Sequence, residues 1–335
     1  MDPARHAGLK RWLFAQSVAL TLCTLAAHAA QEGPAEVLKT PIRWKGVEVI
    51  TNDFDSVGRI REVAALRAGT LLLMSDPKLQ AVCDAVRKEL SSSKVTCTNV
   101  ISATPGGPPD AWYLVEVDIK EREALNCASD GAMGEDLLRL RNAWQEAYAK
   151  SMLRGVVVHE RVNDRKYLDY DQAELSSLAR KIHTTTRSRA GELESAASSC
   201  DPGQRASSFY LMNFVGDPQR FVQLAGSHIN DSDVGAANAA TRFLVVFADF
   251  ISVTDMHSLA TQACRSLQEG GFAARNKSLW LLSASRESGA LSFAQLSAEC
   301  QQQVRNIART SIAEQIAVPA RKLIGDRVDE PEQTR

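Results

Sequence analysis

Residues 231–246 read DSDVGAANAATRFLVV, and this stretch decides the fold of the larger part of the chain. Aspartate and serine residues suited to helix N-capping come first, and a largely apolar helix pattern follows. The same pattern recurs 33 residues earlier and 37 residues later, so that three leucines fall at equivalent positions: Leu211, Leu244 and Leu281. Periods of this length are typical of helical repeats that stack into an α-solenoid. We therefore expect all three leucines to lie in the repeat core.

Residues 200–310 resemble HEAT repeats. Two segments carry the resemblance: Asp231-Ser232-Asp233-Val234 with Asn238 and Arg242, and Arg275-Asn276-Lys277-Ser278-Leu279. Both match the family pattern of an Asp-rich turn, then an asparagine or arginine, then an apolar helix. The resemblance implies a HEAT-like α-solenoid over residues 200–325. We expect residues 134–199 to be a helical segment that caps its N-terminal end, because a solenoid needs such a cap.

Residues 41–122 show a different pattern, which predicts a small α+β domain. A strand over residues 43–51 is followed by two amphipathic helices, and Ser75-Asp76-Pro77 suits the start of the second helix. Two further strands follow, the last of which alternates apolar residues at 113, 115 and 117 with polar ones. The predicted fold class is therefore α+β, with a β-α-α-β-β domain followed by an all-α solenoid.

The β-α-α-β-β segment resembles the polypeptide-transport-associated (POTRA) module. Three stretches carry the resemblance: Val47-Glu48-Val49-Ile50-Thr51-Asn52, Leu66-Arg67-Ala68-Gly69-Thr70 and Trp112-Tyr113-Leu114-Val115-Glu116-Val117. Members of this family lie outside the inner membrane and bind extended peptide segments along a sheet edge, a mode that backbone hydrogen bonding explains. Here there is one copy of the module, and no outer-membrane β-barrel sequence follows it.

Residues 1–30 have the pattern of a secretory signal peptide. Three basic residues precede an interrupted apolar stretch, and Ala27-His28-Ala29 supplies the small residues that a signal peptidase accepts. We expect cleavage near Ala30 and a periplasmic or secreted protein without a stable membrane span. The alternative is an uncleaved N-terminal anchor, which would make the chain a tethered envelope protein.

Seven cysteines are present, and six remain beyond residue 30. An even number of cysteines in an exported protein is typical of disulfides. Cys83 and Cys97 fall on the apolar faces of a helix and of the next strand, so we expect them to form a bridge. The pairing of the other four stays open: Cys127, Cys200, Cys264 and Cys300.

The chain lacks the sequence motifs of common enzymes. No phosphate-binding loop, Cys-x-x-Cys pair, His-Glu-x-x-His or Gly-x-Ser-x-Gly motif occurs. The formal net charge of −1 argues against a nucleic-acid partner. One adjacent histidine and glutamate, His159-Glu160, resembles the metal-binding pairs of some HEAT-repeat enzymes.

These features predict an exported, non-enzymatic protein-binding scaffold or envelope assembly factor. Its partner would be a protein, held by the concave face of the solenoid or by the sheet edge. We assign no catalytic residue, cofactor or metal ligand. The alternative of a different class is a metal-dependent enzyme on the solenoid, centred on His159 and Glu160.

Overall fold

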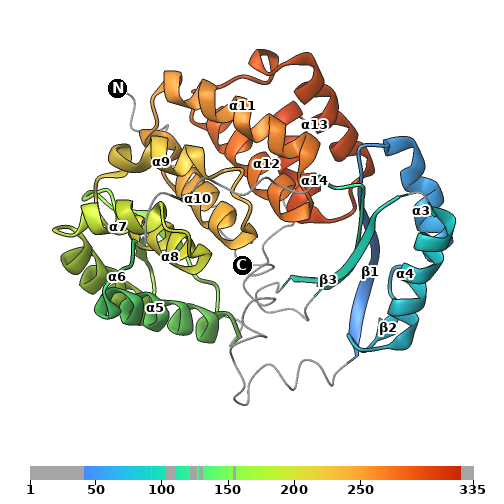
Figure 1. Cartoon of the computed structure of the whole chain (residues 1–335), viewed down its shortest axis with the longest axis horizontal. Helices are drawn as coiled ribbons and strands as arrows, with labels where there is room; N and C mark the ends of the chain where they lie inside the picture. The colour runs from blue at the N-terminus through green and yellow to red at the C-terminus, as the bar shows by residue number, and fades with distance from the viewer. Residues whose placement is uncertain are drawn as a thin grey trace, which may run out of the picture.

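A computed structural model describes residues 41–91, 93–102, 110–120, 127, 131–153 and 156–325. The predicted signal peptide, residues 1–30, lies outside the described residues, so its cleavage stays a prediction. Among the described residues, no helix combines the length and the apolar character that crossing a bilayer requires. The protein combines a curled four-stranded sheet with a larger array of helices (Figure 1).

The N-terminal part contains four strands and two helices. They are β1 (Ile42–Ile50), α3 (Val57–Ala64), β2 (Leu71–Leu72), α4 (Pro77–Glu89), β3 (Val95–Ser102) and β4 (Asp110–Val117). The strand order is β2-β1-β4-β3, with β1 parallel to β4 and the other pairs antiparallel. The predicted order of strand, two helices and two strands is present. The additional strand β2 has two residues, which is too short to leave a pattern in the sequence.

One face of the sheet packs against α3 and α4 and forms a first core. Asp76 caps α4 by accepting the N–H of Lys78 at 2.9 Å, and the next residue is a proline, which suits a first helical turn. Cys83 of α4 and Cys97 of β3 meet in a disulfide with Cα atoms 6.0 Å apart, as their apolar-face positions predict. The bond closes a short loop in a core that is small for an independent domain.

The opposite face of the sheet is buried as well, which the alternating pattern of β4 does not predict. Trp112 and Leu114 lie in the core of the helical part. Glu116, which the alternation places toward solvent, instead accepts the N–H of Phe272 at 2.7 Å. The sheet is therefore a middle layer between two sets of helices (Figure 1).

Ten helices follow the sheet in the described part of the chain. They are α5 (Glu135–Leu153), α6 (Ala173–Thr186), α7 (Ala190–Ala197), α8 (Pro202–Met212), α9 (Val222–Ser227), α10 (Val234–Val246), α11 (Val253–Glu269), α12 (Phe272–Glu287), α13 (Ala298–Thr310) and α14 (Glu314–Ile324). From α7 onward they form consecutive pairs stacked as in an α-solenoid, with α8, α10, α12 and α14 in one layer (Figure 1). Leu211, Leu244 and Leu281 are each at most 1% exposed, as their spacing predicts.

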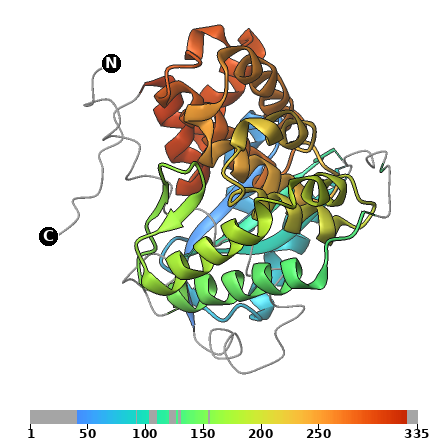
Figure 2. The same cartoon turned by 90° about the vertical axis from the view of Figure 1, so that its left-hand side faces the viewer.

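The segment before the repeats is not purely helical, which corrects the prediction for residues 134–199. Between α5 and α6 in the sequence comes a hairpin of two short strands, β5 (Glu160–Val162) and β6 (Leu168–Tyr170), which Figure 2 shows in yellow-green. Its turn is held by Asn163, whose side-chain oxygen accepts the N–H groups of Arg165 and Tyr167 at 3.0 and 3.3 Å. Strands of three residues show no measurable period-2 pattern, so the sequence suggests only a connector there.

Candidate functional site

Two buried charged side chains join the sheet to the helical array. Glu48 of β1 accepts hydrogen bonds from the Ser311 hydroxyl at 2.6 Å and from the N–H groups of Ile312 and Ala313 at 2.8 and 2.9 Å. These groups precede α14, so the carboxylate lies at the N-terminus of that helix, where negative charge is favoured. Burial nevertheless raises the pKa of Glu48, against these hydrogen bonds and the charge of Arg61.

Arg275 of α12 forms the second connection. Its guanidinium donates to the Thr51 carbonyl at 3.0 Å and to the Asn52 side-chain oxygen at 2.8 Å, just after β1. Burial lowers the pKa of Arg275 to about 10, and Glu116 and Glu48 oppose this shift. Together with Glu116 at the start of α12, these contacts seat the sheet on α12 and α14. The sheet therefore covers parts of α12 and α14, and these parts are not open to a partner protein.

β3 is an edge strand of the sheet, and its outer side faces away from β4. The Lys94 carbonyl accepts the N–H of Asp118 at 2.9 Å, and in an antiparallel ladder only every second residue bonds to the neighbouring strand. The backbone groups of Cys97, Asn99 and Ile101 lie between the bonded positions, so they point away from β4. The Val95 carbonyl, also on this edge, accepts a bond from Arg87. Among the described residues, no strand pairs with this edge of β3. Its remaining backbone groups are those that strand addition uses.

A separate group of charged side chains is buried where the β5–β6 hairpin meets α10 and α12. We call Glu160, Arg242 and Lys277 the polar centre. Arg242 of α10 forms an ion pair with Glu160 of β5, and both are buried. Burial alone would lower the pKa of Arg242, but Glu160 and nearby tyrosines outweigh burial and raise it, so the guanidinium stays charged.

Lys277 of α12 is 6% exposed and forms no ion pair or hydrogen bond with any described residue. Burial and then the charge of Arg242 lower the pKa of Lys277 to about 7, while Glu160 acts in the opposite direction. A lysine with such a pKa exchanges a proton near neutrality, which an ordinary surface lysine does not. Near neutral pH, the amine of Lys277 is therefore about half protonated, and it lies next to the Glu160–Arg242 ion pair.

Aromatic side chains surround the polar centre. The Tyr170 hydroxyl accepts a hydrogen bond from the Trp144 indole at 2.9 Å, and burial, with the charge of Glu160, raises the pKa of Tyr170. Tyr210 of α8 contacts the Asn238 amide at 3.4 Å and lies under the guanidinium of Arg141. Tyr148 and Tyr210 remain partly exposed, so the aromatic shell reaches the surface while the ion pair does not.

The sequence-predicted pair His159-Glu160 does not form a joint site. His159 is exposed, whereas Glu160 is buried against Arg242, because adjacent residues at a strand point to opposite sides. Within the described ranges, no three histidine, cysteine or acidic side chains gather as metal ligands would. The carboxylate that the metal hypothesis needs is engaged in an ion pair.

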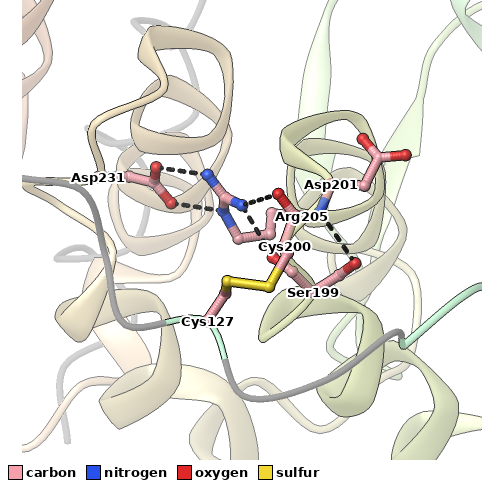
Figure 3. The surroundings of a disulfide bond; sticks show 6 residues. All are labelled: Cys127, Ser199, Cys200, Asp201, Arg205 and Asp231. Atoms are coloured by element: carbon pink, nitrogen blue, oxygen red, sulfur yellow. Dashed lines mark hydrogen bonds and ion pairs between the residues drawn. A yellow bond between two sulfur atoms is a disulfide. The ribbon is translucent and has the colours of Figure 1, made fainter.

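Another buried ion pair, between Arg205 and Asp231, lies beside a disulfide (Figure 3). Arg205 donates two hydrogen bonds of 2.9 Å to the two oxygens of Asp231 and a third, of 2.8 Å, to the Ser199 carbonyl. His228 contacts the same carboxylate at 2.8 Å. These bonds join the start of α8 to the turn before α10, so this cluster holds consecutive repeats together.

The four cysteines whose pairing the sequence leaves open form two further disulfides. Cys127 bonds to Cys200 next to Arg205 (Figure 3), and Cys264 of α11 bonds to Cys300 of α13. The second bond links the outer helices of two successive pairs. Because disulfides persist in oxidising compartments, the three bonds indicate a non-cytoplasmic environment.

Comparison with protein-family models, with curated proteins and with solved structures finds no match to this chain. The β3 edge and the polar centre are therefore the two features of this chain that point to a function.

Proposed function

We propose that the protein is an exported, non-enzymatic assembly factor or scaffold that holds an extended segment of a partner protein along β3. The outer edge of β3 carries this proposal. Its backbone groups at Cys97, Asn99 and Ile101 point away from β4, and a peptide that adds as a strand satisfies such groups with its own backbone.

Two further features support a binding role at this edge. The Cys83–Cys97 disulfide and the helical layer behind β4 hold the sheet on both faces, so the edge is presented by a rigid element. Rigid presentation lowers the entropy lost on binding. Thr96 and Thr98 are exposed on the strand, and they leave room for the side chains of an added strand. The POTRA-like order of the elements agrees with this mode of binding.

The proposal predicts that removing one backbone donor on this edge weakens partner binding. A photo-crosslinking residue at Thr96 in the full-length protein, expressed in its native host, should give one discrete adduct that mass spectrometry identifies. The additional substitution Asn99→Pro removes an outward-facing N–H without interrupting the β3–β4 ladder. We expect it to reduce the adduct at least about ten-fold, the equivalent of about one hydrogen bond.

Asn99→Ala is the matched control because it keeps the N–H and removes only the side chain, which contacts the Met74 carbonyl. It should leave the adduct unchanged. An adduct of equal yield in Asn99→Pro, or no adduct at all with the original sequence, contradicts strand addition at β3.

Export through the N-terminal segment gives a separate expected result. We propose that residues 1–30 are removed, so that mass spectrometry of the protein recovered from the host envelope shows a first residue near Ala30. Recovery of the intact N-terminus in the membrane fraction would instead support the tethered alternative. This outcome leaves the β3 proposal standing, because a tethered protein presents the same edge.

A further inference from the structure

Several buried polar atoms around the polar centre lack hydrogen-bond partners, and they are of two kinds. The donor is the Nε atom of Arg141, and in addition the amine of Lys277, a residue that is 6% exposed, bonds to no described residue. The acceptors are the second carboxylate oxygen of Glu160 and the side-chain oxygen of Asn238. Buried polar groups are nearly always satisfied, so each exception needs an explanation.

These groups belong to one place in the fold. Asn238 and Arg242 are one turn apart on α10, so they share a face of that helix. Arg242 bonds to Glu160, and the charges of both act on Lys277 from α12. Asn238 contacts the hydroxyl of Tyr210, and Arg141 lies 5.7 Å from the centre of the same ring.

A purely structural role does not account for this combination. Unpaired buried charges destabilise a fold, and a lysine that serves only packing would be replaceable by an apolar residue of the same length. The unused donors and acceptors here belong to side chains that share contacts with Tyr210 or act on the same Arg242–Glu160 ion pair. Such an arrangement is complementary to a third molecule that carries both an acceptor and a donor.

We propose that the polar centre binds a small organic acid that carries a hydroxyl or amino group next to its carboxylate. Lys277 and Arg141 donate to the carboxylate, while Glu160 and Asn238 accept from the hydroxyl or ammonium. The cations Arg141 and Arg242 outnumber the carboxylate of Glu160, and Lys277 adds a further positive charge when it is protonated, which favours an anionic ligand. Tyr148 and Tyr210, which are partly exposed, flank the bound molecule.

Proton uptake is a consequence of this geometry. The groups that act on Lys277 are Arg242 from α10 and Glu160 from β5. Those that act on Arg242 are also Tyr170 from β6, Tyr210 from α8 and Tyr148 from α5, and Arg141 from α5 contacts the Tyr210 ring. In the absence of ligand the pKa of Lys277 is about 7, so at pH 8 the amine is mostly neutral. A bound carboxylate favours the charged form and raises this pKa. Binding at pH 8 should therefore take up a proton.

Isothermal titration calorimetry of the full chain tests the proposal with lactate and L-alanine as probes. Propionate, which has the carboxylate without the second group, is the matched control. At pH 8, in two buffers of different ionisation enthalpy, we expect lactate or L-alanine to bind with uptake of close to one proton. Propionate should bind at least about ten-fold more weakly, the equivalent of about one hydrogen bond. No heat from either probe, or equal binding of propionate, overturns the proposal.

Substitutions separate a binding role for Lys277 from a structural one. Lys277→Met keeps the length of the side chain and removes the charge, so it should abolish probe binding while leaving the urea midpoint unchanged or higher. Asn238→Ala is the second variant and should weaken probe binding at least about ten-fold. Lys181→Met, at an exposed position of α6, should change neither property. Unchanged binding in Lys277→Met, or a lowered urea midpoint, overturns the assignment.

Discussion

Replacing Asp231 with alanine is expected to lower the free energy of unfolding by about 3–5 kcal/mol, the usual effect of breaking a buried ion pair from one side. Asp231 is 0% exposed and accepts two hydrogen bonds from Arg205 and one contact from His228. It also accepts the N–H of Asp233 at 2.8 Å. Without the carboxylate, Arg205 becomes an uncompensated buried charge between consecutive repeats. Urea denaturation followed by circular dichroism measures the change.

The same carboxylate predicts how stability depends on pH. Burial alone would raise the pKa of Asp231, but the bonds from His228 and Arg205 outweigh it and lower the pKa from 3.8 to about 2. A lowered pKa means that the folded state holds the ionised form more strongly than the unfolded state does. The resulting stabilisation is complete above pH 3.8 and is lost as the pH falls toward 2. At about 1.4 kcal/mol per pH unit, it amounts to about 2 kcal/mol.

Glu194→Ala is the matched control for Asp231→Ala. Glu194 pairs with Arg220 through two hydrogen bonds of 2.6 and 2.7 Å, but this pair lies at the surface. Removing it should cost less than about 1 kcal/mol, as exposed pairs usually do. If the two substitutions have equal effects, the Arg205–Asp231 pair does not hold the repeats together as we infer. A pH dependence between 4 and 2 that survives in Asp231→Ala would assign that dependence to other groups.

The elements that the sequence predicts well are those whose own residues specify them. Asp76-Pro77 fixes the start of α4 and Asp233 caps α10 by accepting the N–H of Ala236 at 2.8 Å. Periodic apolar residues place Cys83 and Leu244 on buried faces. In these cases local hydrogen bonds and a single apolar face determine the outcome, so no knowledge of distant contacts is needed.

Other features depend on contacts between distant parts of the chain, and the sequence does not reveal them. Glu48 and Glu116 look like surface residues of alternating strands, yet each lies at the start of a helix more than 150 residues away. Asp171 looks like the cap of α6, but its carboxylate accepts the N–H of His159 on the hairpin instead. The bonds of Glu48 and Glu116 hold the helices against the second face of the sheet, so the burial of this face depends on contacts that the local sequence does not show.

The polar centre illustrates the same limit for function. Arg242 and Lys277 occur in the segments that resemble HEAT repeats, where an arginine or lysine suggests an ordinary solvated helix face. Their burial depends on Glu160 and on the short β5–β6 hairpin, which the sequence does not predict. The available signal is at Arg242, a charged residue in a helix whose other residues carry no charge, whereas Lys277 lies among other polar residues of α12. Such residues are rarely buried without a partner or a functional reason.

Replacing Leu244 with alanine is expected to lower the free energy of unfolding by about 2–5 kcal/mol, as large-to-small substitutions in protein cores do. Leu244 is 0% exposed and lies in the main core on α10, the helix between α8 and α12. Its removal leaves a cavity at a position where each repeat packs on the next. A solenoid has few contacts beyond nearest neighbours, so the loss is not shared with distant repeats.

Hydrogen exchange should show how far the Leu244→Ala defect extends. Because α10 contacts both α8 and α12, amide protection should fall in both of these helices, while α4, in the first core, keeps its protection. Gln223→Ala, at an exposed position of α9, is the control and should cost less than about 0.5 kcal/mol. A defect confined to α10, or one that lowers protection equally in α4, would contradict a nearest-neighbour array. The second result would mean that the sheet and the helices unfold as one unit, which the contacts of Glu48 and Arg275 could bring about by coupling the two cores.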